Sequence, residues 1–469
     1  MAIIRKSQQP SLLMRWTNAR PGRMIILSFL LVIAVGTSLL ALPPASASGR
    51  SIGLLQALFT ATSATCVTGL VTVDTATHWS LFGKIVILVL IQTGGLGLVT
   101  ITSFFYILMR RKATLRTLLA TQESTASFNF SDVLQLVRKI VLITFSLEVA
   151  GGLLLSWRLA LLLGWPRALG KGFFLSVSAF CNAGFDLMGD TSSGPFSSLL
   201  SLRDDPLILL TLAVLVILGG LGFVVWSDLL MWPRQRKLNF HSKVVLSLTG
   251  ALLVLGTIFF YAAEPAASLG PANSQSVGTS LLSAFFQSTT SRTAGFAATD
   301  QAGLTDSSKL FTILLMFVGA APGSTGGGIK ITTLAIVVAT IISDVQGRDN
   351  IIMMRHRLTR ETFTRAYALV GLAMGIVLGV TILLSFTERQ ALQTMRLSLL
   401  DLLFETTSAF ATVGLSSAET QNLQPATWAI LIPVMYLGRV GPASFAISLA
   451  MRHHNRTDQV YPEGRTLVG

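Results

Sequence analysis

The chain has 469 residues, of which 51% are hydrophobic and only 12% are charged, and its mean hydropathy is +0.67. About a quarter of the residues in a soluble domain are charged, so this composition indicates an integral membrane protein. The net charge of +14 does not indicate a nucleic-acid-binding protein, because the sequence has no basic groove with interleaved aromatic residues. No nucleophile–base pair stands out either, so we do not expect an enzyme.

A four-part unit occurs four times along the chain. Each unit has an apolar span, a shorter segment rich in small and Ser/Thr residues, a polar stretch and a second apolar span. The predicted division is a cytoplasmic N-terminal segment (1–22), repeat 1 (23–112), repeat 2 (133–237), repeat 3 (240–347), repeat 4 (360–452) and a cytoplasmic C-terminal tail (453–469).

Two kinds of segment alternate within these repeats. The predicted spans are Met24–Leu42, Ser80–Met109, Val133–Leu163, Pro206–Trp232, Val244–Tyr261, Lys309–Ile342, Phe363–Phe386 and Trp428–Met451. The shorter segments are Ser51–Ala64, Gly172–Phe180, Val277–Thr289 and Arg396–Ala409. A membrane-spanning helix needs about 20 residues, so the shorter segments predict re-entrant helices. Two spans and one re-entrant segment return the chain to its starting side, which makes the four repeats parallel rather than inverted.

Each short segment leads into a glycine motif, and the four glycines are 111 to 119 residues apart. Glycine tolerates the turns that bring backbone carbonyl groups to a common axis, where they can replace the hydration shell of a potassium ion. We therefore expect an all-α integral membrane protein with eight transmembrane spans and four re-entrant pore helices around a central, potassium-channel-like pore. The predicted filter residues are Val67, Thr68, Gly69, Asn182, Ala183, Gly184, Thr293, Ala294, Gly295, Thr412, Val413 and Gly414.

The second spans contain glycines of their own. Gly94-Gly95-Leu96-Gly97 and Gly219-Gly220-Leu221-Gly222 share one pattern, and Gly438-Arg439-Val440-Gly441 is a variant of it. Such glycines let neighbouring helices approach closely or bend around a cavity.

The second span of repeat 3 is too long for one crossing and is interrupted by a run of Pro and Gly residues. Unwound backbone at this depth requires protein or water beside it, so the interruption predicts a gate below the filter; a passive kink is the alternative. Nucleotide binding is disfavoured, because Ile329 occupies the place of the Walker lysine. The predicted gate residues are Gly323, Ser324, Thr325, Gly326, Gly327, Gly328, Lys330 and Arg439.

Several charged residues lie close to these motifs. Arg439 lies inside the last apolar span, where a charge needs a partner or water. Arg292 should point away from the cation axis, plausibly toward Glu405 or another pore-helix carboxylate. Glu405 either attracts cations or supports the filter through hydrogen bonds. Asp186 and Asp190 are candidates for the extracellular mouth, with a solvated loop as the alternative.

These motifs resemble those of the Ktr/Trk/HKT superfamily of potassium transporters, and more closely the membrane subunit of bacterial Ktr systems. The most specific pieces are Ser291–Phe296, Gly323–Lys330 and Gly438–Pro442. The resemblance implies a homodimer with one pore per subunit, sodium-stimulated uptake, and a cytosolic RCK-type (KtrA-like) regulatory ring that carries the nucleotide. No covalent cofactor is expected; potassium is the transported ion and sodium an activating or coupled one.

The basic residues gather on one side of this topology, which indicates a multi-pass protein of the inner (plasma) membrane, in contact with lipid, with both termini cytoplasmic. The predicted function is potassium uptake through a four-glycine filter gated by an intramembrane loop. The alternative is a coupled secondary cation symporter with its site at the broken third-repeat helix. A membrane scaffold without transport activity is the third possibility.

Overall fold

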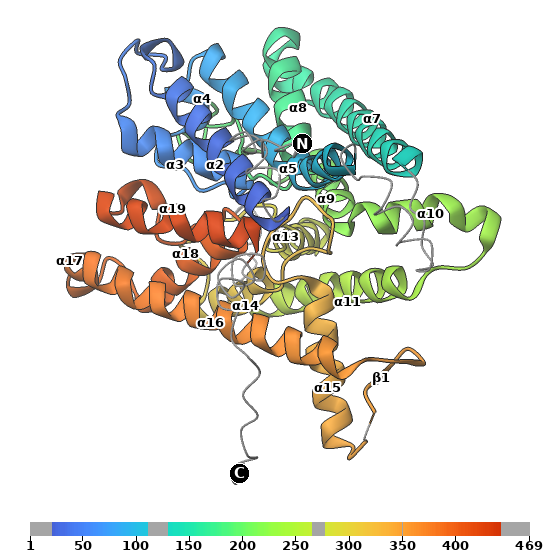
Figure 1. The fold of residues 1–469 in the computed structure, drawn as a ribbon. Helices are drawn as coiled ribbons and strands as arrows, with labels where there is room; N and C mark the ends of the chain where they lie inside the picture. Colours follow the sequence, from blue (N-terminus) through green and yellow to red (C-terminus); the bar gives the residue numbers. More distant parts are fainter. Residues whose placement is uncertain (1–20, 111–129, 265–276, 349, 442–469) are drawn as a thin grey trace, which may run out of the picture.

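The computed structural model describes residues 21–110, 130–264, 277–348 and 350–441, and these residues are mostly helical. Helices from successive parts of the chain surround a centre that contains loops and short helices (Figure 1). The expectation of an all-α chain needs one small correction: strands β1 (Ile352–Met353) and β2 (His356–Arg357) form an antiparallel hairpin after α15.

The first part of the chain forms two long helices with a shorter one between them. Its elements are α2 (Pro21–Leu40), η1 (Pro43–Ala45), α3 (Leu54–Cys66), α4 (Thr75–His78) and α5 (Leu81–Arg110). Helix α3 ends at Cys66, two residues after the predicted end of the re-entrant segment at Ala64. It ends because Val67 adopts a left-handed conformation, with φ at 58°.

The second part contains a sharp bend within its second apolar span. Its elements are α7 (Phe130–Leu163), α8 (Trp165–Phe180), η2 (Leu200–Leu202), α9 (Pro206–Leu221) and α10 (Phe223–Gln235). The chain bends by 99° between α9 and α10, where Gly222 has a φ of 87°. The predicted span Pro206–Trp232 therefore consists of two helices joined at a sharp bend, one of the two roles that its glycines allow, because only glycine adopts this turn readily.

The third part has the predicted interruption. Its elements are α11 (Phe240–Ala263), α13 (Val277–Thr290), α14 (Asp306–Phe317) and α15 (Ile331–Val345). The 13 residues between α14 and α15, 318–330, contain the expected Pro/Gly-rich loop. The loop closes on itself, because the Gly319 amide donates to the Ile329 carbonyl at 2.7 Å.

The fourth part again has two long helices around a shorter one. Its elements are α16 (Arg360–Thr387), α17 (Arg389–Gln393), α18 (Leu399–Ala411), η3 (Thr420–Asn422) and α19 (Pro425–Val440). A capping box between Ser398 and Asp401 starts α18. The predicted span beyond Gly441 lies outside the described residues.

Length and composition identify three helices that can each cross a membrane: α7, α11 and α16. Helices α9 and α10 together make a fourth candidate, and the remaining apolar helices are shorter over their described lengths. The described residues thus supply fewer full-length spans by this test than the eight expected.

Glycines of the second spans pack against the ends of the short helices, as their pattern predicts. A Cβ atom on Gly94 would overlap the carbonyl oxygen of Thr65 at the end of α3. The same holds for Gly219 against Phe180 at the end of α8 and for Gly438 against Phe410 in α18. The absent side chains allow each second-span helix to support the end of a short helix.

Candidate ion pathway

The four motif glycines meet in one ring. A Cβ atom added to Gly69 would lie 3.1 Å from the Cα atom of Gly184 and 3.3 Å from that of Gly414. One added to Gly295 would lie 3.0 Å from the Cα atom of Gly184 and 3.3 Å from that of Gly414. The glycines therefore follow one another around the ring in chain order, and no side chain fits between them.

The four loops share a backbone conformation. Each ring glycine has a positive φ, between 71° and 95°, and so does the residue two positions before it. Those preceding residues are Val67 (58°), Asn182 (58°), Thr293 (68°) and Thr412 (51°). A left-handed conformation is uncommon for β-branched residues such as Val and Thr, so its recurrence at the same position indicates one loop geometry built four times.

The third loop differs in its hydrogen bonds. In the other three loops, the residue before the glycine donates its amide to a carbonyl five residues earlier, as Thr68 does to Ser63 at 2.8 Å. In the third loop, Ala294 donates to Thr290 at 3.0 Å, four residues earlier. The third loop therefore differs from the other three in its backbone hydrogen bonds.

Four short helices end at the ring: α3, α8, α13 and α18. Their carbonyl ends carry partial negative charge, which favours a cation in the space that they face. The twelve predicted filter residues all lie in these helix ends and loops, and all except the half-buried Gly414 are buried. The Asn182 amide lies 3.2 Å from the Thr293 hydroxyl and so joins the second and third loops.

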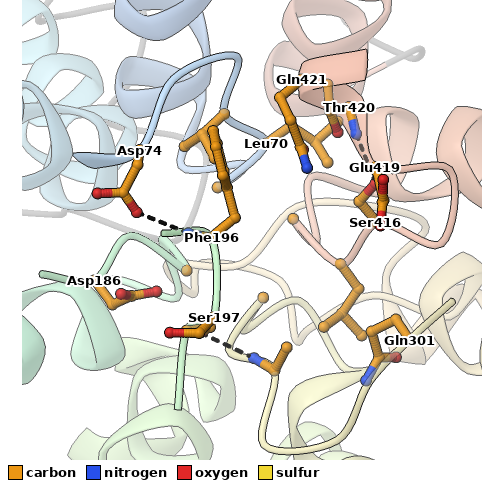
Figure 2. A pocket seen from close by; sticks show the side chains of 18 of the residues that line it. Leu70, Asp74, Asp186, Phe196, Ser197, Gln301, Ser416, Glu419, Thr420 and Gln421 are labelled. Carbon is orange, nitrogen blue, oxygen red and sulfur yellow. Dashed lines mark hydrogen bonds between the residues drawn. The ribbon is translucent and has the colours of Figure 1, made fainter. Parts of the chain in front are cut away.

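A cavity of about 360 Å³ opens above the ring and is lined by all four glycines. We call it the vestibule. Its lining comes from four separate parts of the chain (Figure 2). Among the described residues, the vestibule lining includes Asp74, Asp186, Asp300 and Glu419 but no Lys or Arg. Four acids without a basic counterpart attract cations to the ring.

The two predicted mouth acids have different positions. Asp186 lines the vestibule, and its carboxylate accepts a hydrogen bond from the Met188 amide at 2.9 Å. Removal from water raises the pKa of Asp186 above its ordinary value, and the nearby Asp74 carboxylate adds to this effect. Asp190 is not among the lining residues and instead forms an ion pair with Lys171. Asp190 is exposed in the loop, so of the two alternatives the solvated loop applies to this residue.

The Pro/Gly-rich loop lies directly against the other side of the filter. A Cβ atom on Gly326 would overlap the Thr293 hydroxyl, and one on Gly327 would overlap the Thr412 hydroxyl. Backbone bonds attach the loop to the break between α9 and α10, since the Thr325 amide donates to Gly219 at 3.2 Å. The loop can sit this close to two filter segments because glycine leaves room.

Two basic side chains hold this loop. Lys330 donates to the carbonyl oxygen of Gly326 at 2.8 Å. Arg439, which is buried, donates to the carbonyl oxygen of Thr325 and to that of Gly94. Carbonyl groups of the loop thus accept hydrogen bonds from both Lys330 and Arg439. Arg439 also joins the loop to α5 through the Gly94 carbonyl.

Arg292 and Glu405 are both buried but are not partners. Glu405 accepts hydrogen bonds from Ser416, at 2.8 Å, and from Thr420, which favours the filter-supporting alternative. Arg292 lines a small cavity with Thr249 of α11 and residues of α9. It points away from the vestibule as expected, but the suggested direction toward Glu405 is wrong, because α9 and α11 surround the guanidinium.

Two polar clusters near the pore were missed by the sequence analysis. Buried Glu148 of α7 accepts a hydrogen bond from Gln92 of α5 at 3.1 Å and has the Cys181 thiol 3.9 Å from its other oxygen. Lys309 of α14 forms a 2.8 Å ion pair with Asp401 at the start of α18. A single acid within a long apolar run is itself a signal, and it would have identified Glu148.

Comparison with known proteins places this geometry in a family. The family model for TrkH, described as a cation transport protein, matches residues 3–457. The chain belongs to the TrkH family of cation transport proteins. Among other TrkH-family proteins, it is 38% identical to Ktr system potassium uptake protein B of Vibrio alginolyticus over 451 residues, covering 95% of this chain and 94% of the relative.

Two further comparisons agree with that assignment. Potassium/sodium uptake protein NtpJ of Enterococcus hirae is 34% identical, with 96% of this chain and 97% of the relative covered. The crystal structure of the potassium transporter TrkH from Vibrio parahaemolyticus superposes with a TM-score of 0.69 at 16% identity. That match covers 92% of this chain and 85% of the solved one, so the TrkH-family fold extends over nearly the whole molecule.

Proposed function

We propose that this chain is the potassium-translocating membrane subunit of an uptake system. The ring of four glycines carries the proposal, because four helix carbonyl ends converge on it beneath an acidic vestibule. The names of two relatives, a Ktr system potassium uptake protein and a potassium/sodium uptake protein, give the ion.

In this proposal the four loops are the selectivity filter. Backbone carbonyl groups of the twelve residues that precede and include Gly69, Gly184, Gly295 and Gly414 coordinate a dehydrated potassium ion. One glycine per loop makes a short filter with few ion sites. The close contact between neighbouring glycines explains why no larger residue is suitable there.

The gate in this proposal is the loop Gly323–Gly328. Two observations support this assignment: the loop contacts Thr293 and Thr412 below the ring, and its carbonyl groups accept hydrogen bonds from Lys330 and Arg439. Movement of the loop away from these threonines opens the path. Arg439 belongs to repeat 4, and Gly219, which accepts from the Thr325 amide, belongs to repeat 2, so a change in either repeat can be transmitted to the loop.

The proposed setting is the inner (plasma) membrane, with four parallel repeats that supply eight spans and with both termini cytoplasmic. The shorter apolar helices complete the spans that length alone does not identify. A homodimer and a cytosolic RCK-type regulatory ring fit the name of the Ktr relatives, which describes a system of components. Sodium stimulation is proposed because one relative is named for both ions.

Uptake measurements test the filter directly. In cells without other potassium uptake, rubidium and potassium influx would be measured with and without sodium for the wild type and Gly295→Ala. A Cβ atom on Gly295 would overlap the Val413 carbonyl oxygen and would also force an L-residue to a φ of 80°. We expect at least a tenfold loss of potassium preference or of flux.

Gly49→Ala is the matched control. Gly49 has a similar φ of 68°, but a Cβ atom there meets nothing within 4 Å. It therefore reproduces the backbone strain, about 1 kcal/mol, without the overlap. Wild-type selectivity in a well-expressed Gly295→Ala variant would refute the filter assignment. Sodium-independent uptake by the wild type would refute the proposed stimulation.

A further inference from the structure

A second large cavity, of about 820 Å³, opens between α14, α16, α17 and α18. We call it the α17 cavity. Its walls are amphipathic: Arg389 and Arg396 lie among Phe386, Leu392, Met395 and Leu399. Neither the vestibule nor the gate loop contributes to its lining, so ion permeation does not account for it.

The charges of the α17 cavity leave one positive charge without a partner. Lys309 and Asp401 neutralise each other at 2.8 Å. Asp306 also lines the cavity, but Arg389 and Arg396 add two positive charges. Both arginines are exposed, and neither side chain forms an ion pair with a described acid. The lining therefore has a net charge of +1, which one phosphodiester would balance.

The apolar part of the α17 cavity continues along a helix that is well suited to lipid. In α16 the most apolar window has a mean hydropathy of 2.5, and only 17% of it is buried. The helix leads into the cavity through Phe386, which is 71% exposed, and Met395 on the far side of α17 is 93% exposed. Acyl chains can follow α16 while a headgroup lies at the arginines, which present fixed donors to phosphate.

We propose that the α17 cavity binds one anionic phospholipid of the phosphatidylglycerol class. The phosphodiester lies between Arg389 and Arg396, and the acyl chains lie on the exposed face of α16. A headgroup of net charge −1 matches the lining, whereas a zwitterionic headgroup leaves the positive charge unbalanced.

Such a lipid would sit one contact away from the ion path. Asp401 lines the α17 cavity and also accepts a hydrogen bond from Ser417 at 2.9 Å. The preceding residue, Ser416, lines the vestibule. Because Asp401 also caps α18, occupation of the cavity steadies the helix whose far end enters the glycine ring. Lipid composition then affects the fourth filter loop.

The test compares lipid retention by the purified full-length chain in detergent micelles doped with phosphatidylglycerol, phosphatidylethanolamine or phosphatidylcholine. Native mass spectrometry counts the lipids retained per chain. We expect the wild type to retain one more phosphatidylglycerol than Arg389→Ala/Arg396→Ala and to require about tenfold less of it, because two charge-assisted contacts are lost. Phosphatidylglycerol should also raise the melting temperature of the wild type selectively.

Arg50→Ala is the control, since Arg50 is exposed and does not line the α17 cavity; it should retain lipid like the wild type. Melting in phosphatidylcholine checks that the double variant is folded. Equal phosphatidylglycerol retention in the wild type and a folded double variant would overturn the proposal. Equal retention of all three lipids by the wild type would also overturn the proposal. The same holds if mass spectrometry shows that the double variant loses a second copy of the chain rather than a lipid.

Discussion

The guanidinium of Arg439 lies 2.6 Å from the carbonyl oxygen of Gly94, a residue 345 positions earlier in the chain. The same guanidinium donates to the carbonyl oxygen of Thr325 in the gate loop. One side chain thus joins the last described helix, the loop and α5 at a point beside the end of α3. A planar group with several fixed donors can make both contacts at once.

Replacing Arg439 with Gln should release the loop. Each hydrogen bond from a charged donor is worth about 1.5–3 kcal/mol, and a Gln side chain is too short to keep both. We expect basal rubidium influx to rise severalfold, measured in uptake-deficient cells. Arg439→Lys should give the same direction, because a single ammonium lacks the fork geometry. Arg50→Gln is the control; unchanged basal flux in both Arg439 variants would contradict the clamp.

Replacing Glu148 with Leu should disturb the second filter loop. The change removes the carboxylate that accepts from the Gln92 amide and lies beside the Cys181 thiol, and an unsatisfied buried amide costs about 1–3 kcal/mol. A lower melting temperature and a reduced preference for potassium over sodium are expected. Glu361→Gln serves for comparison, since Glu361 belongs to an exposed pair within α16. A stable Glu148→Leu variant with normal ion preference would show that the cluster is dispensable.

Replacing Glu405 with Ala should weaken the segment after the fourth glycine. The Ser416 and Thr420 hydroxyls lose their acceptor inside the protein, at a cost of about 1–3 kcal/mol. Thermal unfolding and potassium affinity measure this effect. Glu419→Ala changes an exposed acid of the vestibule and should reduce uptake at low potassium without lowering the melting temperature. The reverse pattern would exchange the roles assigned to the two acids.

Asp186 should give the vestibule a pH dependence. Because its pKa is raised, the carboxylate gains a proton at a higher pH than an ordinary Asp, and the vestibule then loses one negative charge. Uptake at low potassium should fall as the external pH is lowered through that pKa. Protonation favours the folded state, so this group's contribution to stability increases over the same range and is complete below about pH 3.9.

The variant Asp186→Asn checks this assignment. Its uptake at neutral pH should match that of the acidified wild type, and its own pH profile should be flatter in this range. A wild-type profile retained in full by Asp186→Asn would show that Asp186 is not the titrating group.

The positions of the ring glycines were predictable from sequence because one motif recurs at three similar spacings, of 111 to 119 residues, and so marks four equivalent turns. The C-terminal ends of the short helices were predicted within two residues, since the glycine motifs mark them. The sequence did not decide whether the chain bends by 99° at Gly222, because a glycine in an apolar run is equally compatible with a bend and with close helix packing. The direction of Arg292 also depended on which helix surrounds it, which no local pattern specifies.

Chain order around the ring has a consequence for biosynthesis. Gly414 is the neighbour of Gly69, and the Tyr436 hydroxyl donates to the Ile26 carbonyl at 2.7 Å. The first and last parts of the chain therefore close the circle against each other. Until the fourth motif has been synthesised, the ring lacks one of its four loops. An unfinished chain therefore cannot provide a complete coordination shell for an ion. If the ring is the filter that we propose, selectivity is acquired only in the final stage of synthesis.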